Sequence, residues 1–288
     1  RCEPMGRRGR LTTPAAPRRI AAMPGAVDRA RAGKELAAAG LDALVLCSPE
    51  AFRWATGAPA GVAAGWRRFG AAVAVVPADP ARPVGAVATD LFGAAAQAAG
   101  CEPLRLHAIW PETADIRPFL PSDEDVAALV ARAVAARAPG FARPATFDRG
   151  AALALLRDVL ATMGLGAARL GVEFSALPVA DFAALRDAAG PATLHDASVL
   201  LDRLRAVKTA GEIAALREAG AITEAALAAL IPHLREGATR AALGRRFLDL
   251  VQEVAAARGT RGAVTAWEYA GFGASPWSSP GGLARGDV

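Results

Sequence analysis

From Val27 onward, hydrophobic residues follow two alternating patterns along the chain. Short apolar runs bounded by Gly, Pro or Asp predict strands, and apolar positions repeating every three or four residues predict helices. Strands are predicted at 41–47, 69–76, 84–89, 103–107, 146–148, 169–173 and 193–196, and helices at 27–39, 91–99, 123–136, 151–163 and 179–189. This alternation is typical of an α/β domain with a largely parallel or mixed sheet.

Near Ser198 the alternation gives way to consecutive helices. Thr209 and Glu212 have the spacing of a capping box, in which each side chain satisfies a backbone donor at a helix start. The helix should end near Ile231, because Pro232 is strongly unfavourable in a helix interior. One face of this helix is predicted to be buried: Ile213, Leu216, Gly220, Thr223, Leu227 and Leu230.

A second helix is predicted to begin at Thr239, after a loop marked by Gly237. Its apolar face comprises Leu243, Phe247, Leu250, Val251 and Val254. The two helices are therefore expected to pack together. A strand at 264–269 and a loop-rich segment at 271–286 follow.

Length and composition indicate one or two globular domains. The 288 residues are 53% hydrophobic, with a mean hydropathy of +0.26, which supplies enough apolar material for buried cores. No apolar run reaches the roughly 18 residues needed to cross a bilayer. We expect a soluble protein without a membrane partner.

The formal net charge of +5 is concentrated at the beginning of the chain. Residues 1–26 hold six Arg and one Glu, whereas the remaining basic and acidic residues balance. The body therefore has no net field to attract nucleic acid. The Arg- and Pro-rich segment 1–26 is predicted to be a disordered tail: a nucleic-acid or membrane-surface arm, a targeting peptide, or an over-extended start. We favour the last, with Met23 as the true initiator.

Cysteine and arginine usage indicate a cellular setting. Cys2, Cys47 and Cys101 are odd in number and form no C-x-x-C pair, so reduced, buried thiols in a cytoplasmic protein are the simplest interpretation. The 33 basic residues comprise 31 Arg and only two Lys, a bias typical of a GC-rich bacterial genome.

Several of these segments resemble a known family when taken in order. The stretch RAVKTAGEI (Arg205 to Ile213), followed by REAGAITEAALAAL and REGATRAALGRRFLDLV, resembles the entry into the catalytic domain of the creatinase, prolidase and aminopeptidase P family of metallopeptidases. Upstream, LDALVLCSPEAFRWATG (Leu41 to Gly57) resembles the first strand and turn of that family's amino-terminal domain. The resemblance runs from about Val27 to Val288.

The resemblance implies a fold in two parts. Residues 27–197 would form an amino-terminal creatinase-like α/β domain with a mixed sheet. Residues 198–288 would form the first helices of an incomplete α+β pita-bread catalytic domain. Because the sheet against which those helices pack would lie further on, they should expose apolar side chains such as Leu216 and Leu227.

The resemblance also implies the chemistry of the parent protein. In the family, two Asp, one His and two Glu hold two divalent metal ions of the manganese, cobalt or zinc class, all beyond a Gly-Asp turn. Here Gly286-Asp287-Val288 matches that turn, and Asp287 matches its structural Asp. This chain would thus bind no metal and be inactive alone. The full-length parent would be a homodimeric hydrolase acting on an Xaa-Pro-type peptide bond or a related small amide.

Candidate site residues follow from the same resemblance. Aligning GASPWSSP with the family's substrate-facing His element places Trp277 at the His position, and a Trp side chain can neither accept a proton nor bind a metal. This substitution leaves three interpretations open: a variant hydrolase that acts on a non-peptide amide or cyclic amidine, a shifted register, or a structural Trp. In related enzymes, loops of the amino-terminal domain can reach a neighbouring subunit's active site. The resemblance therefore makes Trp54, Trp66, Arg67 and Arg68 candidate substrate contacts; surface packing is the alternative.

Other motifs carry less weight. His107, His195 and His233 lie on different elements, where structural roles are more common than metal binding, and neither H-E-x-x-H nor a phosphate-binding loop occurs. Two alternatives to a peptidase remain. One is a non-catalytic binding or assembly module on the same scaffold; the other is a non-peptide amidohydrolase similar to creatinase or ectoine hydrolase.

Overall fold

The computed structural model describes residues 25–61, 67–107, 116–136, 147–260 and 264–266. Of the predicted tail 1–26, only residues 25 and 26 are described, and Met23 lies outside the described residues. Contacts within the chain divide it into two compact units, Arg1–Val207 and Lys208–Val288. Each unit is described by itself.

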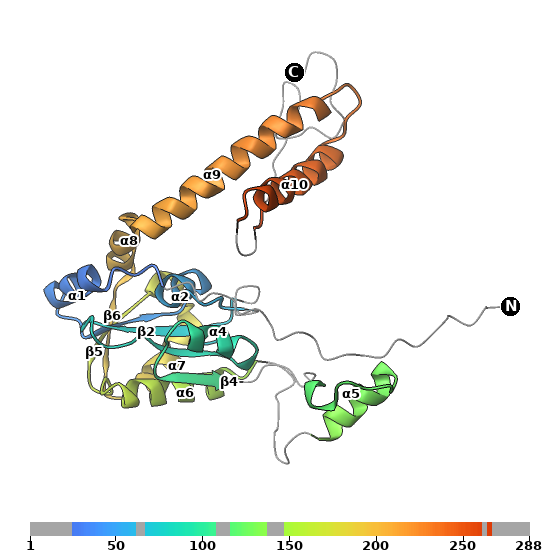
Figure 1. The fold of residues 1–288 in the computed structure, drawn as a ribbon. Coiled ribbons are helices and arrows are strands. Elements are labelled where there is room, and N and C mark those ends of the chain that lie inside the picture. Colours follow the sequence, from blue (N-terminus) through green and yellow to red (C-terminus); the bar gives the residue numbers. More distant parts are fainter. Residues whose placement is uncertain (1–24, 62–66, 108–115, 137–146, 261–263, 267–288) are drawn as a thin grey trace. The chain divides into compact units, whose positions relative to one another are not determined.

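The first unit is built on a six-stranded mixed sheet with the order β4-β3-β2-β1-β5-β6 (Figure 1). Strand β2 is antiparallel to β1 and β3, and the other neighbouring strands are parallel. The carboxyl ends of five strands and the beginning of β2 consequently share one edge. The bounds are β1 Ala43–Leu46, β2 Val73–Pro77, β3 Gly85–Thr89, β4 Leu104–His107, β5 Arg169–Val172 and β6 Thr193–Asp196.

Seven α-helices are described in this unit: α1 Arg29–Ala38, α2 Pro49–Thr56, α4 Gly93–Ala98, α5 Val126–Ala135, α6 Arg149–Thr162, α7 Val179–Ala189 and α8 Ser198–Ala206. Short 3₁₀ turns occupy Asp90–Phe92, Arg117–Phe119 and Phe174–Ala176. Four helices begin where a side-chain oxygen accepts a backbone N–H of the first turn, namely at Asp28, Ser48, Asp125 and Asp148. Such caps explain why the helices start there.

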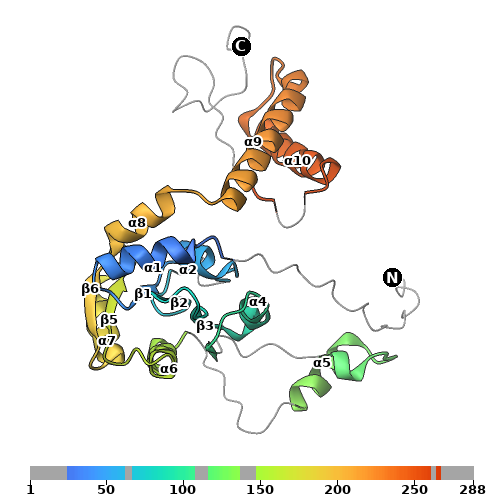
Figure 2. The ribbon, with the colours of Figure 1, turned by 60° about the vertical axis from the view of Figure 1, so that its left-hand side comes forward.

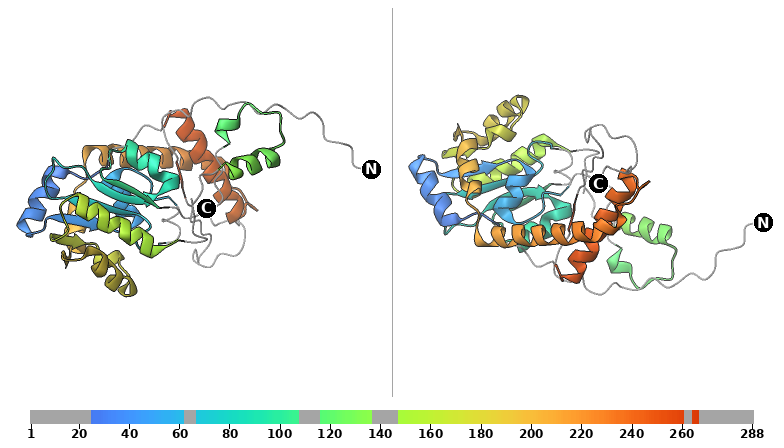
Figure 3. Two further views of the ribbon diagram at one scale, coloured as in Figure 1. Left: turned by 90° about the horizontal axis from the view of Figure 1, so that it is seen from below. Right: turned by 90° about the horizontal axis from the view of Figure 1, so that it is seen from above.

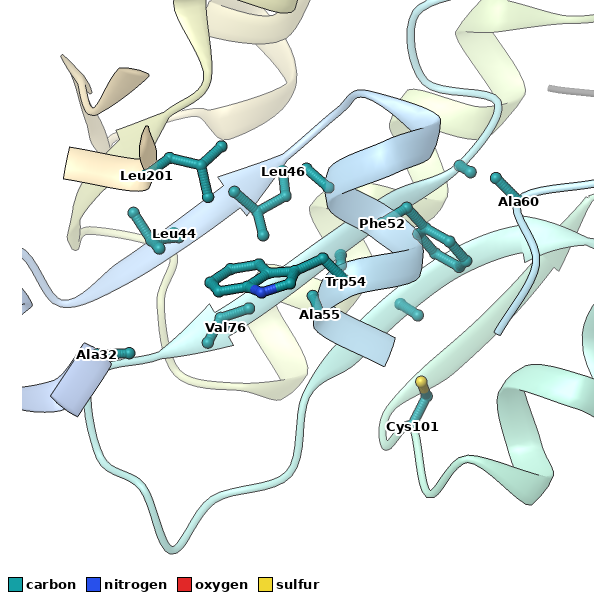
Figure 4. Close-up of a cluster of buried hydrophobic side chains, with 14 of the residues drawn as sticks. Ala32, Leu44, Leu46, Phe52, Trp54, Ala55, Ala60, Val76, Cys101 and Leu201 are labelled. Atoms are coloured by element: carbon teal, nitrogen blue, oxygen red, sulfur yellow. The ribbon is translucent and has the colours of Figure 1, made fainter. Parts of the chain in front are cut away.

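Two hydrophobic cores cover the two faces of the sheet. One combines alternate strand residues with side chains of α1, α2 and α8, among them Leu36, Phe52 and Leu201 (Figure 4). The other lies under α6 and α7 and includes Leu156 and Leu185. The ribbon shows α6 and α7 on the opposite side of the sheet from α1 and α8 (Figures 2 and 3). The first unit thus has the predicted α/β layering with a mixed sheet.

Three sequence expectations for the first unit need correction. The strand predicted at 146–148 is wrong for its described part, because Phe147 and Asp148 are in no strand and Asp148 instead caps α6. Strand β2 starts at Val73, later than the predicted Phe69. The turn expected after β1 contains helix α2, which Ser48 caps and Pro49 starts.

The end of the first unit also differs from the boundary expected near Ser198. Helix α8 belongs to the first unit, because Leu200, Leu201 and Leu204 are buried in the same core as α1. The guanidinium of Arg31 on α1 also donates hydrogen bonds to the carbonyl oxygens of Arg203 and Leu204. The division therefore falls after α8, between Val207 and Lys208.

The second unit contains α9 Ala210–Leu230, a 3₁₀ turn at Ile231–His233 and α10 Arg240–Ala257. The capping box is confirmed: Thr209 Oγ1 accepts the N–H of Glu212 at 3.2 Å, and Glu212 Oε2 accepts the N–H of Thr209 at 2.8 Å. The predicted apolar face of α10 is also confirmed, with Leu243, Leu250 and Val251 buried.

The buried stripe predicted for α9 is wrong. Ile222 and Ala226 contact the buried face of α10, whereas Leu216 and Leu227 are 59% and 50% exposed. The burial depends on which face α10 covers, and α10 packs on the face that carries Ile222 and Ala226. The expectation that Leu216 and Leu227 would be exposed is confirmed.

Residues 264–266 form no strand, and the rest of the predicted 264–269 strand lies outside the described residues. None of the described helices combines the length and apolarity that crossing a membrane requires.

Candidate functional site

A small pocket lies at the carboxyl edge of the sheet, beside the end of β1. Its volume is about 210 Å³. Loops at the carboxyl ends of parallel strands are a common place for ligand sites in α/β proteins, because side chains from several strands converge there. The lining residues are Cys47, Ser48, Pro49, Arg67, Arg68, Phe69, Ala72, Ala176 and Pro178.

Glu173, which directly follows β5, fixes the wall of this pocket. Its carboxylate accepts the backbone N–H groups of Cys47 and Ser48 at 3.2 and 3.0 Å, and the Ser48 hydroxyl at 2.8 Å. The Ser48 Oγ in turn accepts the N–H of Ala51, which caps α2. Strands β1 and β5 and the start of α2 are thereby joined by one buried, hydrogen-bonded carboxylate.

Cys47 lies in this wall but is not a candidate nucleophile. Burial raises the pKa of its thiol far above the ordinary value, and the negative charge of Glu173 raises that pKa further. A thiolate is the reactive form of cysteine, and this environment disfavours it. Cys101 is likewise buried, with its pKa raised to about 11 by burial.

Arg67 and Arg68 supply positive charge at the pocket. Arg67 donates to Glu50 at 2.7 Å, and both side chains of this ion pair are largely exposed. A hydrogen bond from its own backbone N–H lowers the pKa of Glu50 most, and Arg67 lowers it further, with burial opposing both. In the part of the chain that the structure describes, no carboxylate pairs with Arg68. The pocket therefore combines an apolar wall with one available guanidinium.

The backbone of Arg67 is unusual. Its φ of +46° lies in the left-handed region, which few residues other than Gly adopt because the Cβ clashes with the backbone. Such a conformation persists only when surrounding contacts hold it. The ion pair with Glu50 is one such contact, and it ties the Arg67 loop to the first turn of α2.

The structure separates the four predicted substrate contacts. Arg67 and Arg68 line the same pocket. The side chain of Trp54 is instead buried in the core between α2 and the sheet, in the cluster that includes Leu44 and Val76 (Figure 4). Packing accounts for Trp54, and we leave it out of the proposed site. Trp66 and Trp277 lie outside the described residues.

The three histidines have different hydrogen-bond partners. His107 Nε2 donates to the carbonyl oxygen of Ala71, His195 Nε2 contacts the Thr193 hydroxyl, and His233 Nε2 accepts from Arg246. The described residues include no group of three or more His, Cys, Asp or Glu that could hold a metal ion. They therefore do not supply the two-metal centre that the family resemblance implies for the parent protein.

The sequence of the first unit matches a family model, the creatinase/prolidase N-terminal domain, over residues 29–207. The chain belongs to this family. The match covers the described part of the first unit from α1 to the end of α8, which agrees with the division of the contacts after Val207.

Solved structures with the same fold include three peptidases. An X-Pro aminopeptidase from Thermotoga maritima MSB8 has a TM-score of 0.51 and 12% identity, covering 78% of this chain and 49% of that one. A prolidase from Thermococcus sibiricus has a TM-score of 0.51 and 16% identity, covering 78% and 48%. A dipeptidase from Pyrococcus horikoshii OT3 has a TM-score of 0.50 and 16% identity, covering 78% and 49%.

These identities support a shared fold and no more. The chain spans about half the length of each of these structures. None of the curated proteins matches it.

Within this creatinase/prolidase domain, sequence reasoning missed Glu173 and Ser48. Glu173 carried a signal, because an acidic residue directly ends an apolar strand, at the edge where functional groups gather. Its partner Ser48 lies 125 residues earlier. Nothing in the local sequence indicates that pairing.

Proposed function

We propose that this chain is the amino-terminal domain, together with the opening helices of the catalytic domain, of an Xaa-Pro peptidase-like metallohydrolase. The observation that carries the proposal is the family match over residues 29–207, which coincides with the first compact unit. Structures of an X-Pro aminopeptidase and a prolidase share its fold. The substrate would be a peptide or a related small amide.

The remaining properties of the parent belong to the same proposal. It would be a bacterial, cytoplasmic homodimer using two divalent metal ions of the manganese, cobalt or zinc class. Such ions would activate a water molecule and polarise the scissile carbonyl. We assign no metal ligand to the described residues, and the chain alone is expected to be inactive.

The role proposed for this domain is to contact the substrate through the pocket. A dipeptide ending in proline carries a carboxylate and an apolar ring. A guanidinium suits the carboxylate, because its planar N–H groups can donate two parallel hydrogen bonds. Arg68 is available for that contact, and Phe69, Ala72 and Pro178 provide an apolar wall.

Steady-state kinetics of the full-length protein containing this chain test the proposal. With Ala-Pro as substrate and Mn²⁺ present, Arg68→Ala should raise KM about tenfold with little change in kcat, the loss expected for a hydrogen bond to a charged group. The matched control is Arg186→Ala, which removes an exposed Arg on α7 whose ion-pair partner among the described residues is its neighbour Asp187. Its KM should stay unchanged.

The substrate provides a second control. Ala-Pro amide lacks the carboxylate, so Arg68→Ala should have little effect on its KM. An equal effect on both substrates would contradict the carboxylate contact. Absence of any hydrolysis of Xaa-Pro peptides by the metal-loaded full-length protein would overturn the peptidase assignment.

A further inference from the structure

Glu173 is the one buried carboxylate among the described residues, with 6% of its surface exposed. Burying a charge is costly unless hydrogen bonds compensate it. Here three donors do so: the backbone N–H groups of Cys47 and Ser48 and the Ser48 hydroxyl. Burial raises the pKa of the neighbouring Cys47 thiol, and the negative charge of Glu173 raises it further.

A continuous set of contacts leads from Glu173 to the pocket arginines. Ser48 is both the partner of Glu173 and the N-cap of α2, so Glu173 fixes where that helix begins. The first turn of α2 carries Glu50, which pairs with Arg67. Arg67 has a left-handed backbone conformation, and Arg68 is the next residue along the chain.

We propose that Glu173 is a positioning residue, which holds Ser48 and the first turn of α2 so that Glu50 orients Arg67 and Arg68 at the pocket. A carboxylate suits this place for a further reason. The backbone N–H groups at a helix start are partial positive charges that favour a nearby anion. The inference rests on the proposed function of the pocket as a substrate contact, but its structural step can be tested separately.

Limited trypsin digestion tests the structural step, because trypsin cleaves after arginine. Mass spectrometry would follow cleavage at Arg67 and Arg68, with Arg157 on α6 as the reference. Arg157 is held in the same unit by hydrogen bonds to the carbonyl oxygens of Asp187 and Ala188. Glu173→Gln should speed cleavage at Arg67 and Arg68 about fivefold relative to Arg157, since it removes a charged acceptor. Equal acceleration at all three sites would show a general loss of stability and overturn the inference.

Two further variants keep this test decisive. Ser48→Ala breaks the same link with a smaller change, and it carries the test if Glu173→Gln does not fold. It should also accelerate cleavage selectively at Arg67 and Arg68. The control Glu102→Gln alters an exposed carboxylate of the same unit and should leave the cleavage pattern unchanged.

Kinetics of the full-length protein test the functional step. Glu173→Gln should raise KM for Ala-Pro about fivefold, and it should add nothing in an Arg67→Ala, Arg68→Ala background, because residues acting through one another are not additive. An undiminished effect in that background would overturn positioning. If the arginine variants leave KM unchanged while selective cleavage persists, the proposed function fails and the positioning of the Arg67 loop stands.

Discussion

At the scale of single residues, the type of a side chain does not reveal its role in this domain. Trp54 lies on helix α2, and Arg68 lines the pocket beside the start of that helix. Both were candidate substrate contacts. Trp54 fills the core between α2 and the sheet, whereas Arg68 is exposed at a pocket. Tryptophan is typical of cores and of binding surfaces alike. Only its surroundings distinguish the two roles.

Phe52 provides a direct test of that core. Its side chain is fully buried in the cluster that contains Trp54 (Figure 4). Phe52→Ala should lower the free energy of unfolding by about 3–5 kcal/mol, because it removes apolar contacts and leaves a cavity. Urea unfolding followed by tryptophan fluorescence would measure the loss.

A matched phenylalanine serves as the control for Phe52. Phe182 on α7 is 36% exposed, and its ring packs edge to face against the ring of Phe174, with 5.4 Å between the ring centroids. Phe182→Ala should lower the free energy of unfolding by only about 1 kcal/mol. Equal losses for the two variants would contradict the assignment of Phe52 to the main core.

At the scale of elements, Glu218 joins α9 to the end of α10. Arg258 donates two hydrogen bonds to its carboxylate, at 2.9 and 2.8 Å, and the Thr260 hydroxyl donates a third at 2.9 Å. The Arg258 bond, followed by the Thr260 bond, lowers the pKa of Glu218 from its ordinary 4.5 to about 2, with burial opposing. Because the pKa is lowered on folding, this contact stabilises the second unit above pH 4.5 and is lost as the pH falls toward 2.

Glu218→Gln should therefore destabilise the α9–α10 pair at pH 7, and the difference from wild type should shrink as the pH falls from 4.5 toward 2. Circular dichroism at 222 nm during thermal unfolding would measure it across that range. The control is Glu224→Gln, an exposed substitution on the same helix. NMR titration of the Glu218 carboxyl gives a direct check, since an ordinary pKa near 4.5 would contradict the prediction.

At the scale of the whole chain, each unit has its own core. Both large clusters of the first unit draw their buried residues from positions up to Leu204, and the clusters of the second unit begin at Ile222. Helix α8 belongs to the first core although it precedes the second unit directly. The place of α8 makes the boundary testable.

Two truncations should behave differently. A chain ending at Val207 should keep the unfolding midpoint of the first unit, because all of its core is present. A chain ending at Ala197 lacks Leu200, Leu201 and Leu204, so its midpoint should fall by more than 5 °C, the shift expected when several kcal/mol of buried apolar contact are lost. Tryptophan fluorescence during heating would compare them. Equal midpoints would show that α8 contributes nothing to the first core.

The sequence by itself determined the features that depend on neighbouring residues. Helix α7 and strand β6 have the predicted bounds, because their apolar patterns lie between Pro178, Gly190 and Asp196. The Thr209 capping box needs only residues three positions apart. The stretches Leu41 to Gly57 and Arg205 to Ile213, with the helices that follow, also indicated the family. The family model supports that assignment over residues 29–207. Local hydrogen bonding and periodicity suffice for such features.

Only the tertiary structure decided features that join distant parts of the chain. The buried face of α9 depends on where α10 packs, so Ile222 and Ala226 are buried and Leu216 is not. The assignment of α8 depends on its contact with α1. The link between Glu173 and Ser48 spans 125 residues and exists because β1 and β5 are parallel neighbours. Periodicity shows that a helix or strand has an apolar face and a polar face. The segment that packs against it elsewhere in the fold determines which of its residues are buried.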